Sequence, residues 1–523
     1  MSLPDDEDTG VDQRLPRGLC AALFIGSLGF WGLVFQRSVL ALDDMGFILR
    51  GRERLTSLAD VLDMLHHDVV VQNGRIADTV LSLVAAAGDE RAARAYFAVA
   101  LSSLFPTALI WLSFLVPRSV RRDLPSFVLP LVAAASPLLL LALDRRLISQ
   151  LALFGAASSG YCTGLFLVSV GLVPLLRTAD GLATPPRVMV GSAVSLLVGV
   201  MFHEVLAALV LGALVSAALV AVRTPIRRRQ LLTLLPPLLL AVALKASTPG
   251  LWSRTADTDQ RQLADASLVA RTDVALAFAL VAFVPLLAYV ATSIAVSLPS
   301  RGVATRRVVL LGGVGAVLVL VGAGYRALGG YPLGGVVTAS TIVCLVAAIW
   351  LLRPARVTPA ELVALGATAL AFAVPVYGGL LPGRAWFFGE YLALLVALSW
   401  LARGAAGLGP GRVDLRAPRP ASGARWLASA LLGAGLVVGP TLAYEMLDKV
   451  NDNYAWRAYV DAQVLEQEDG VVDIPWTYPW NDMRPSFAID GDHEEWEQLV
   501  RDYFEIPSDV RIEWNGSVDW MDG

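Results

Sequence analysis

Two adjacent carboxylates, Asp43 and Asp44, have the type and spacing in this chain that best fit acid–base chemistry. They follow an apolar run long enough to cross a bilayer, so they lie where a helix would reach the membrane surface. A carboxylate there can take a proton from a hydroxyl group that attacks the anomeric carbon of a sugar, as the base does in inverting glycosidases. Burial at the membrane edge would raise its pKa into a useful range. A pair that only ends the helix and marks the interface fits the spacing equally well.

A short motif further along, Asn73-Gly74-Arg75, has the composition of a phosphate contact. Its glycine permits a tight turn, and its arginine presents a planar fork of donors that matches a phosphate group. The motif is short, and an ordinary exposed turn also accounts for it. Asn73 and Arg75 are therefore candidate contacts to a phosphate-bearing substrate.

Four more ionisable residues are candidates for binding the same substrate. His203 and Glu204 interrupt an otherwise apolar stretch at residues 188–222, where such side chains are costly and usually face a cavity or a partner. Lys245 and Arg384 each lie at the end of an apolar run, where a cation can neutralise a phosphate leaving group. A helix hairpin that reaches water explains the first two as well, and interfacial anchoring explains the two cations.

Metal-binding patterns are weak in this sequence. The adjacent His66 and His67 lack a third ligand at a telling spacing, so we interpret them as solvated residues of an amphipathic helix. The cysteines, Cys20, Cys162 and Cys344, all lie in apolar runs, which argues against a zinc cluster or a disulfide framework. No cofactor is expected with certainty, and a divalent metal is left open.

The elements that must position these residues are membrane helices. Of the 523 residues, 56% are hydrophobic and only 16% are charged, unlike the composition of a soluble globular protein. Each apolar run must satisfy its own backbone, so it forms a helix. We predict an all-α polytopic protein with thirteen transmembrane helices, near Leu19–Leu42, Ala95–Leu115, Ser126–Leu143, Leu151–Leu176, Val188–His203, Val205–Val222, Leu231–Leu244, Val274–Val296, Val308–Tyr325, Gly334–Leu352, Glu361–Val376, Ala385–Trp400 and Trp426–Tyr444.

Arginine-rich breaks alternate with breaks that carry few basic residues, and the positive-inside rule places the arginine-rich ones in the cytoplasm. The expected layout in the plasma membrane is a cytoplasmic tail (1–18), a transmembrane domain (19–443) and an extracytoplasmic C-terminal domain (444–523). The first extracytoplasmic loop (43–94) carries apolar residues at helical spacing, which predicts a helix lying in the interface. These residues are Leu58, Val61, Leu62, Leu65 and Val69.

The last 80 residues are strongly acidic, with 20 acidic and five basic side chains. Such a charge argues against nucleic acid as a partner. Tryptophans scattered among the charges, with proline and glycine between them, predict a small soluble cap. Membrane lipids are the partners that the rest of the chain implies.

Several of these features together resemble the polytopic GT-C class of glycosyltransferases, and more narrowly a bacterial family of uncharacterised membrane proteins. They are the acidic pair after the first helix, the interfacial helix, Asn-Gly-Arg, His-Glu and the tail residues Trp496, Tyr503, Phe504 and Ile506. The resemblance implies a GT-C-like fold and a sugar donor carried on polyprenyl phosphate. It also implies that Asp43 or Asp44 is the base, and that Arg75, His203, Lys245 and Arg384 neutralise the phosphate.

The leading hypothesis is an inverting transfer of a sugar from polyprenyl phosphate to a cell-envelope glycan or lipid at the outer face. A transporter or flippase of lipid-linked glycans is the main alternative, although its ionisable residues would be expected near the midplane. A non-catalytic envelope assembly protein that docks through its acidic tail is a third alternative.

Overall fold

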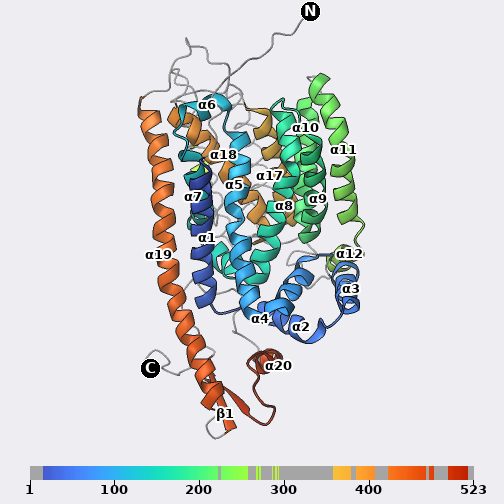
Figure 1. Cartoon of the computed structure of the whole chain (residues 1–523), viewed down its shortest axis with the longest axis vertical. Helices are drawn as coiled ribbons and strands as arrows, with labels where there is room; N and C mark the ends of the chain where they lie inside the picture. The colour runs from blue at the N-terminus through green and yellow to red at the C-terminus, as the bar shows by residue number, and fades with distance from the viewer. Residues whose placement is uncertain are drawn as a thin grey trace, which may run out of the picture.

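The computed structural model describes residues 16–72, 74–221, 225–256, 357–378, 384–406, 422–466, 470–475 and 493–515, with single residues between 267 and 293. Long helices run side by side along the molecule, and a layer of shorter helices closes one end (Figure 1). The helices that form the bundle are α1 (Arg17–Arg37), α4 (Ala77–Ser102), α5 (Leu104–Leu115), α7 (Val128–Leu143), α8 (Gly155–Ala179), α9 (Pro186–Phe202), α10 (Glu204–Ala221), α11 (Pro225–Ala246), α17 (Pro359–Tyr377), α18 (Phe387–Ala406) and α19 (Ser422–Glu466).

Within the described residues, eight helical segments are long and apolar enough to cross a membrane, which makes the chain a polytopic membrane protein. Two shorter apolar helices, α7 and α9, have 16 and 17 residues. α18 is the most enclosed span, because 89% of its apolar stretch is buried against 17% for α1. Residues at the start of α18 are therefore held on several sides by other helices.

Most of the predicted helices coincide with described ones, but their ends differ. The predicted spans Val308–Tyr325 and Gly334–Leu352 lie outside the described residues, as does most of Val274–Val296, so the count of thirteen stays a prediction. The last helix was expected to end at Tyr444, which is wrong, because α19 continues to Glu466.

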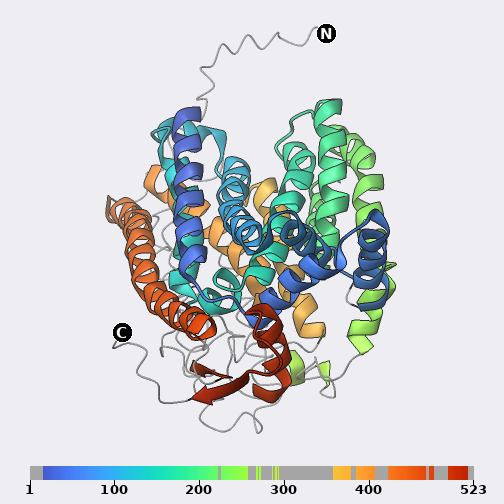
Figure 2. The ribbon, with the colours of Figure 1, turned by 60° about the horizontal axis from the view of Figure 1, so that its bottom comes forward.

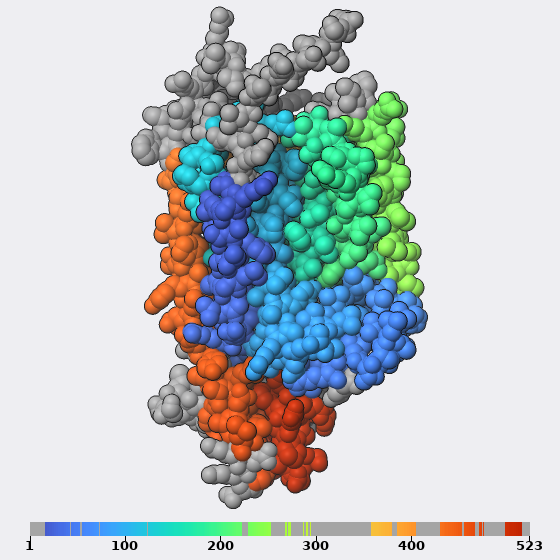
Figure 3. All heavy atoms as spheres, viewed as in Figure 1, coloured from blue at the N-terminus to red at the C-terminus, as the bar shows by residue number. Residues whose placement is uncertain are grey.

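The predicted first loop forms a layer of helices at one end of the bundle. Figure 3 shows this segment, in blue, covering that end beside the C-terminal residues. α4 enters the bundle from this layer through a break at Gly88 and Asp89, whose backbone angles are not helical. The apolar repeat around Leu58 does form a helix, as predicted. The short elements of the layer are α2 (Leu42–Arg54), α3 (Leu58–His66), a π-helix at His67–Gln72 and α12 (Pro249–Ala256).

The remaining short helices cap the ends of the bundle. They are α6 (Arg118–Asp123), a π-helical turn at Ile148–Ala152 and a 3₁₀ turn at Arg384–Trp386. The last of these leads directly into α18.

The C-terminal residues form a small unit beyond the helical layer (Figure 2). β1 (Val471–Pro475) and β2 (Arg511–Asn515) pair in parallel, with Val471 opposite Arg511. Parallel strands need a crossover, and α20 (His493–Tyr503) lies between them in sequence. The unit buries apolar side chains of its own, namely Val472, Ile474, Val500, Val510 and Ile512.

Candidate active site

Asp43 and Asp44 lie in the first turn of α2, after a short extended segment that follows α1. The first helix was predicted to run to Leu42, but it ends at Arg37, so this prediction was too long by about one turn. Acidic side chains in the first turn are stabilised by the positive end of the helix dipole. The acidic pair therefore marks the start of a second helix and not the end of the first.

Asp44 is fully buried, and both of its carboxylate oxygens accept backbone N–H groups. The donors are Ala41 at 3.2 Å, Gly155 at 3.1 Å and Ala156 at 2.6 Å. Burial raises the pKa of Asp44 to about 7, although these three donors oppose the rise. Such a pKa suits a general base, but the enclosed carboxylate has no surface for a substrate. Asp44 instead fastens the start of α2 to the start of α8.

Gly155, one of these donors, is a position where a side chain does not fit. A Cβ atom there would lie 2.2 to 2.5 Å from three ring atoms of Phe97. We expect Gly155→Ala to push the start of α8 away from Asp44 and to lower the free energy of unfolding by about 2 kcal/mol. Thermal unfolding of the purified protein measures this change. Gly191→Ala on α9, where nothing lies within 4 Å, is the matched control, and equal melting temperatures would contradict the prediction.

Asp43, in contrast, is exposed. The surrounding protein removes water from its carboxyl group and raises its pKa, and the positive charge of Arg384 acts in the opposite direction. The carboxylate and the guanidinium come from α2 and from the turn before α18, which are far apart in sequence. An accessible carboxylate beside a cation can accept a proton from one group while the cation holds an anion.

Arg384 is held by the π-helical turn before α8. Its guanidinium carbon lies 4.6 Å from the centroid of the Phe154 ring, and its backbone N–H donates to Oε1 of Gln150 at 3.2 Å. Stacking on an aromatic ring fixes the plane of a guanidinium. Phe154 immediately precedes Gly155, so one segment positions both Arg384 and the donors to Asp44.

The other predicted residues that the structure describes form a second cluster. It lies between the helical layer and His203, the residue that separates α9 from α10. Arg75 makes a bidentate ion pair with Glu204, with Nε and Nη2 at 2.9 and 2.6 Å from the two carboxylate oxygens. Burial lowers and Glu204 raises the pKa of Arg75, and the net shift is upward. The carboxylate of Glu204 already neutralises the positive charge of Arg75. The ion pair also links residue 75 to the start of α10. Asn73, its predicted companion, lies outside the described residues.

His203 and Lys245 complete this second cluster. The His203 ring is buried against Tyr161 and Phe388, with ring centroids 4.3 and 5.4 Å away, and its Nδ1 accepts the N–H of Val205 at 3.3 Å. Buried Lys245 donates to the carbonyl oxygen of Gly74. The cluster therefore supports the 74–75 segment, and its contact with a substrate stays a prediction.

Both clusters lie near the first residues of α8 and α18. Asp44 meets α8 at Gly155, and Tyr161 lies six residues later, about 9 Å along the helix axis. Tyr161 stacks on Phe388 of α18 with ring centroids 5.1 Å apart. The structure thus brings Asp43 together with Arg384, and Arg75 with His203, Glu204 and Lys245, on either side of an aromatic contact.

A buried carboxyl pair near this site was not predicted as functional. Glu390, on α18, is 1% exposed and neighbours Asp144, which is 2% exposed and makes an ion pair with Arg146 at 2.6 Å. Asp144 follows the apolar run of α7, so the signal in the sequence was an acidic residue at a helix end beside two arginines. Among the described residues, no group of three or more histidine, cysteine, aspartate or glutamate side chains is arranged to hold a metal ion.

Comparisons with protein-family models, curated proteins and solved structures found no match to this chain.

Proposed function

We propose that this membrane protein is a glycosyltransferase that moves a sugar from a polyprenyl-phosphate donor to a cell-envelope glycan or lipid at the outer face of the plasma membrane. The observation that carries the proposal is that exposed Asp43 lies near enough to Arg384 for the positive charge of the guanidinium to act on its carboxylate, at the end of the bundle where the helical layer meets the spans. A base and a phosphate-binding cation are the two groups that such a transfer needs.

In this proposal Asp43 is the general base. Its carboxylate takes the proton from the acceptor hydroxyl as the hydroxyl oxygen forms a bond to the anomeric carbon. The bond from that carbon to the phosphate oxygen breaks, and its electron pair leaves with the polyprenyl phosphate. Attack opposite to the leaving group inverts the anomeric centre.

Arg384 is the residue that neutralises the phosphate in this proposal. Negative charge grows on the phosphate as the glycosidic bond breaks, and a preorganised guanidinium stabilises that charge more strongly in the transition state than in the ground state. Because Arg75 is paired with Glu204, it and the neighbouring His203 and Lys245 act in the proposal by shaping the wall of the site.

A lipid-linked donor has to reach the site from the bilayer, and the helical layer offers an apolar rim on that route. Leu58, Leu62, Val71 and Trp252 are between 52 and 74% exposed, and they lie on α3, the adjoining π-helix and α12. Exposed apolar side chains at helical spacing suit a helix that lies in the headgroup region. The rim supports the prediction of an interfacial helix.

The pH dependence of transfer follows from Asp43. A general base works in its ionised form, so kcat/KM should rise with pH and level off above a pKa that is higher than the ordinary aspartate value. Removing the cation in Arg384→Gln should move this acid limb to higher pH and lower kcat/KM by about 100-fold. Arg145→Gln, which removes an exposed arginine paired with Glu445, is the control. An acid limb that stays in place in Arg384→Gln would contradict the assigned pair.

The decisive experiment is transfer by the purified protein in nanodiscs, supplied with a panel of polyprenyl-phosphate sugars and envelope acceptors. Turnover that depends on the lipid-linked donor supports the proposal. Uptake or flipping of the same lipid in proteoliposomes without any transfer would replace it with the transporter hypothesis.

A further inference from the structure

The break in α4 places two acidic residues, Asp89 and Glu90, beside α2, the helix that carries Asp43. Asp89 has φ 60° and ψ −154°, a conformation that residues other than glycine rarely adopt. A strained residue of this kind persists when its surroundings hold it in place. Here Arg52, near the end of α2, forms an ion pair with the Asp89 carboxylate. The break therefore fixes the far end of α2 and presents the next residue, Glu90, towards the C-terminal residues.

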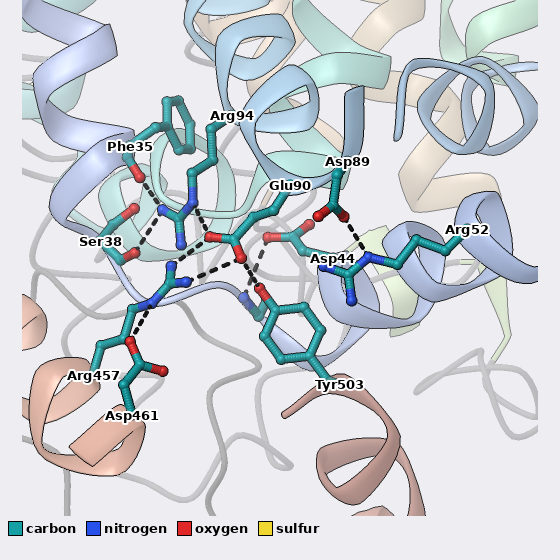
Figure 4. A network of polar contacts seen from close by, with 11 residues as sticks. Phe35, Ser38, Asp44, Arg52, Asp89, Glu90, Arg94, Arg457, Asp461 and Tyr503 are labelled. Carbon is teal, nitrogen blue, oxygen red and sulfur yellow. Dashed lines mark hydrogen bonds and ion pairs between the residues drawn. The ribbon is translucent and has the colours of Figure 1, made fainter. Parts of the chain in front are cut away.

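Glu90 is the centre of a network that joins three distant parts of the chain (Figure 4). Its carboxylate accepts hydrogen bonds from Arg457 at 2.5 and 3.0 Å, from the Tyr503 hydroxyl at 2.6 Å and from Nε of Arg94 at 2.5 Å. Arg457 belongs to α19 and Tyr503 to α20. Glu90 thus joins α4 to both α19 and the C-terminal unit.

The same network reaches the turn before Asp43. Nη1 of Arg94 donates to the carbonyl oxygens of Phe35 and of Ser38, the latter at 2.9 Å. The last carbonyls of a helix lack partners within the helix, and a guanidinium that binds them fixes the direction of the chain beyond. Since Glu90 holds Arg94, the C-terminal unit, Glu90 and the α1–α2 turn form one continuous chain of contacts.

We propose that Glu90 is a positioning residue: it couples docking of the C-terminal unit to the α1–α2 turn, and thereby holds Asp43 and Asp44 in place. The effect on catalysis rests on the proposed transferase function, whereas the coupling itself does not. Without the Glu90 carboxylate, the guanidinium groups of Arg94 and Arg457 lose the negative charge that they share. The C-terminal unit and the α1–α2 turn then both lose a contact that holds them to α4.

Docking is measured first, with a pair of introduced cysteines. A Cβ atom at Gly46 of α2 would lie 3.9 Å from Cδ1 of Leu499 of α20, so Gly46→Cys with Leu499→Cys reports this contact. The natural cysteines, Cys20, Cys162 and Cys344, are replaced by alanine in the full-length chain. Glu90→Gln should lower the rate of crosslinking by about fivefold or more. Tyr503→Phe, which removes a single donor and keeps the ring, should lower it less.

Positioning of the turn is measured by backbone hydrogen exchange. The amides of Ala41, Gly155 and Ala156 donate to Asp44, so their protection reports where that carboxylate lies. Glu90→Gln should speed their exchange by about tenfold. The control is Glu445→Gln, which removes another ion pair of α19, the one to Arg145, and leaves the contacts of Glu90 intact. This control should leave exchange at all three amides unchanged.

The outcomes separate the coupling from the proposed activity. Unchanged crosslinking or unchanged exchange in Glu90→Gln overturns the coupling, whether or not the protein transfers sugar. If wild type transfers sugar, Glu90→Gln should lower kcat with little change in KM, and the crosslink between positions 46 and 499 should restore kcat. Loss of kcat that the crosslink does not restore overturns the positioning role.

Discussion

Replacing Asp43 with asparagine should lower kcat/KM for sugar transfer by about 1000-fold, because the amide cannot accept the proton of the acceptor hydroxyl. The fold should be unaffected, since Asp43 is exposed and Asp44 alone fastens α2 to α8. The measurement is transfer in nanodiscs at a pH above the acid limb, with thermal unfolding as the check on folding.

The matched control for Asp43 is Asp63→Asn, which changes an exposed aspartate on α3 in the same helical layer. This variant should keep at least half of the wild-type rate. Full activity in Asp43→Asn would remove Asp43 from the mechanism, and loss of activity in both variants would point to the charge of the whole layer.

The second large effect is expected on stability, from Asp44→Ala. The substitution removes the acceptor of three N–H groups, two of them buried and that of Ala156 partly buried, and each buried group without an acceptor costs about 1 to 3 kcal/mol. We expect a loss of about 3 kcal/mol or more in the free energy of unfolding, measured by chemical or thermal denaturation in detergent. The activity of Asp44→Ala should fall only as much as the fraction of folded protein falls. The pH dependence of kcat/KM should stay as in wild type.

A second aspartate in the same chain provides a close control for this prediction. Asp60 of α3 also accepts backbone N–H groups near a helix start, those of Thr56 and Ser57, but these hydrogen bonds are exposed to solvent. Water can replace the carboxylate there, so Asp60→Ala should lower the melting temperature much less than Asp44→Ala does. Equal losses in the two variants would show that the buried contacts to α8 do not stabilise the protein.

The sequence was sufficient to predict a chain with several membrane-spanning helices, because apolar runs and the need to satisfy the backbone leave few alternatives. It did not predict where α1 ends. No glycine or proline occurs among residues 38–45, and the carbonyls at the end of α1 are bound by Arg94, which lies far away in sequence. The end of the helix is therefore decided by a tertiary contact.

The length of α19 was missed for a different reason. Polar residues after Tyr444 indicated a break, but buried Met446, Val450, Trp456 and Val460 continue one face of the helix. Their helical spacing is the signal that would have extended the prediction to Glu466.

The candidate site was predicted in part. The acidic pair follows the first apolar run, as the sequence indicates, but it lies in the first turn of α2 and not at the end of α1. Its position on the outer side of the membrane stays a prediction. The sequence did not predict which of the two aspartates is accessible. Asp44 is buried because it binds the backbone N–H groups of Gly155 and Ala156, whose side chains give no indication of this contact. The Glu90 network joins residues 367 positions apart, and a single sequence has no periodicity that reveals such a pair.

The order of synthesis gives the contacts around Glu90 a further meaning. Residues 35 to 94 leave the ribosome long before Arg457 and Tyr503 do. At about 5 to 20 residues per second, the turn at Ser38 waits roughly 20 seconds or more for the partners that complete its support. A nascent chain therefore inserts its early helices before the α1–α2 turn has its support, and this end of the bundle is completed only after Tyr503 has been synthesised.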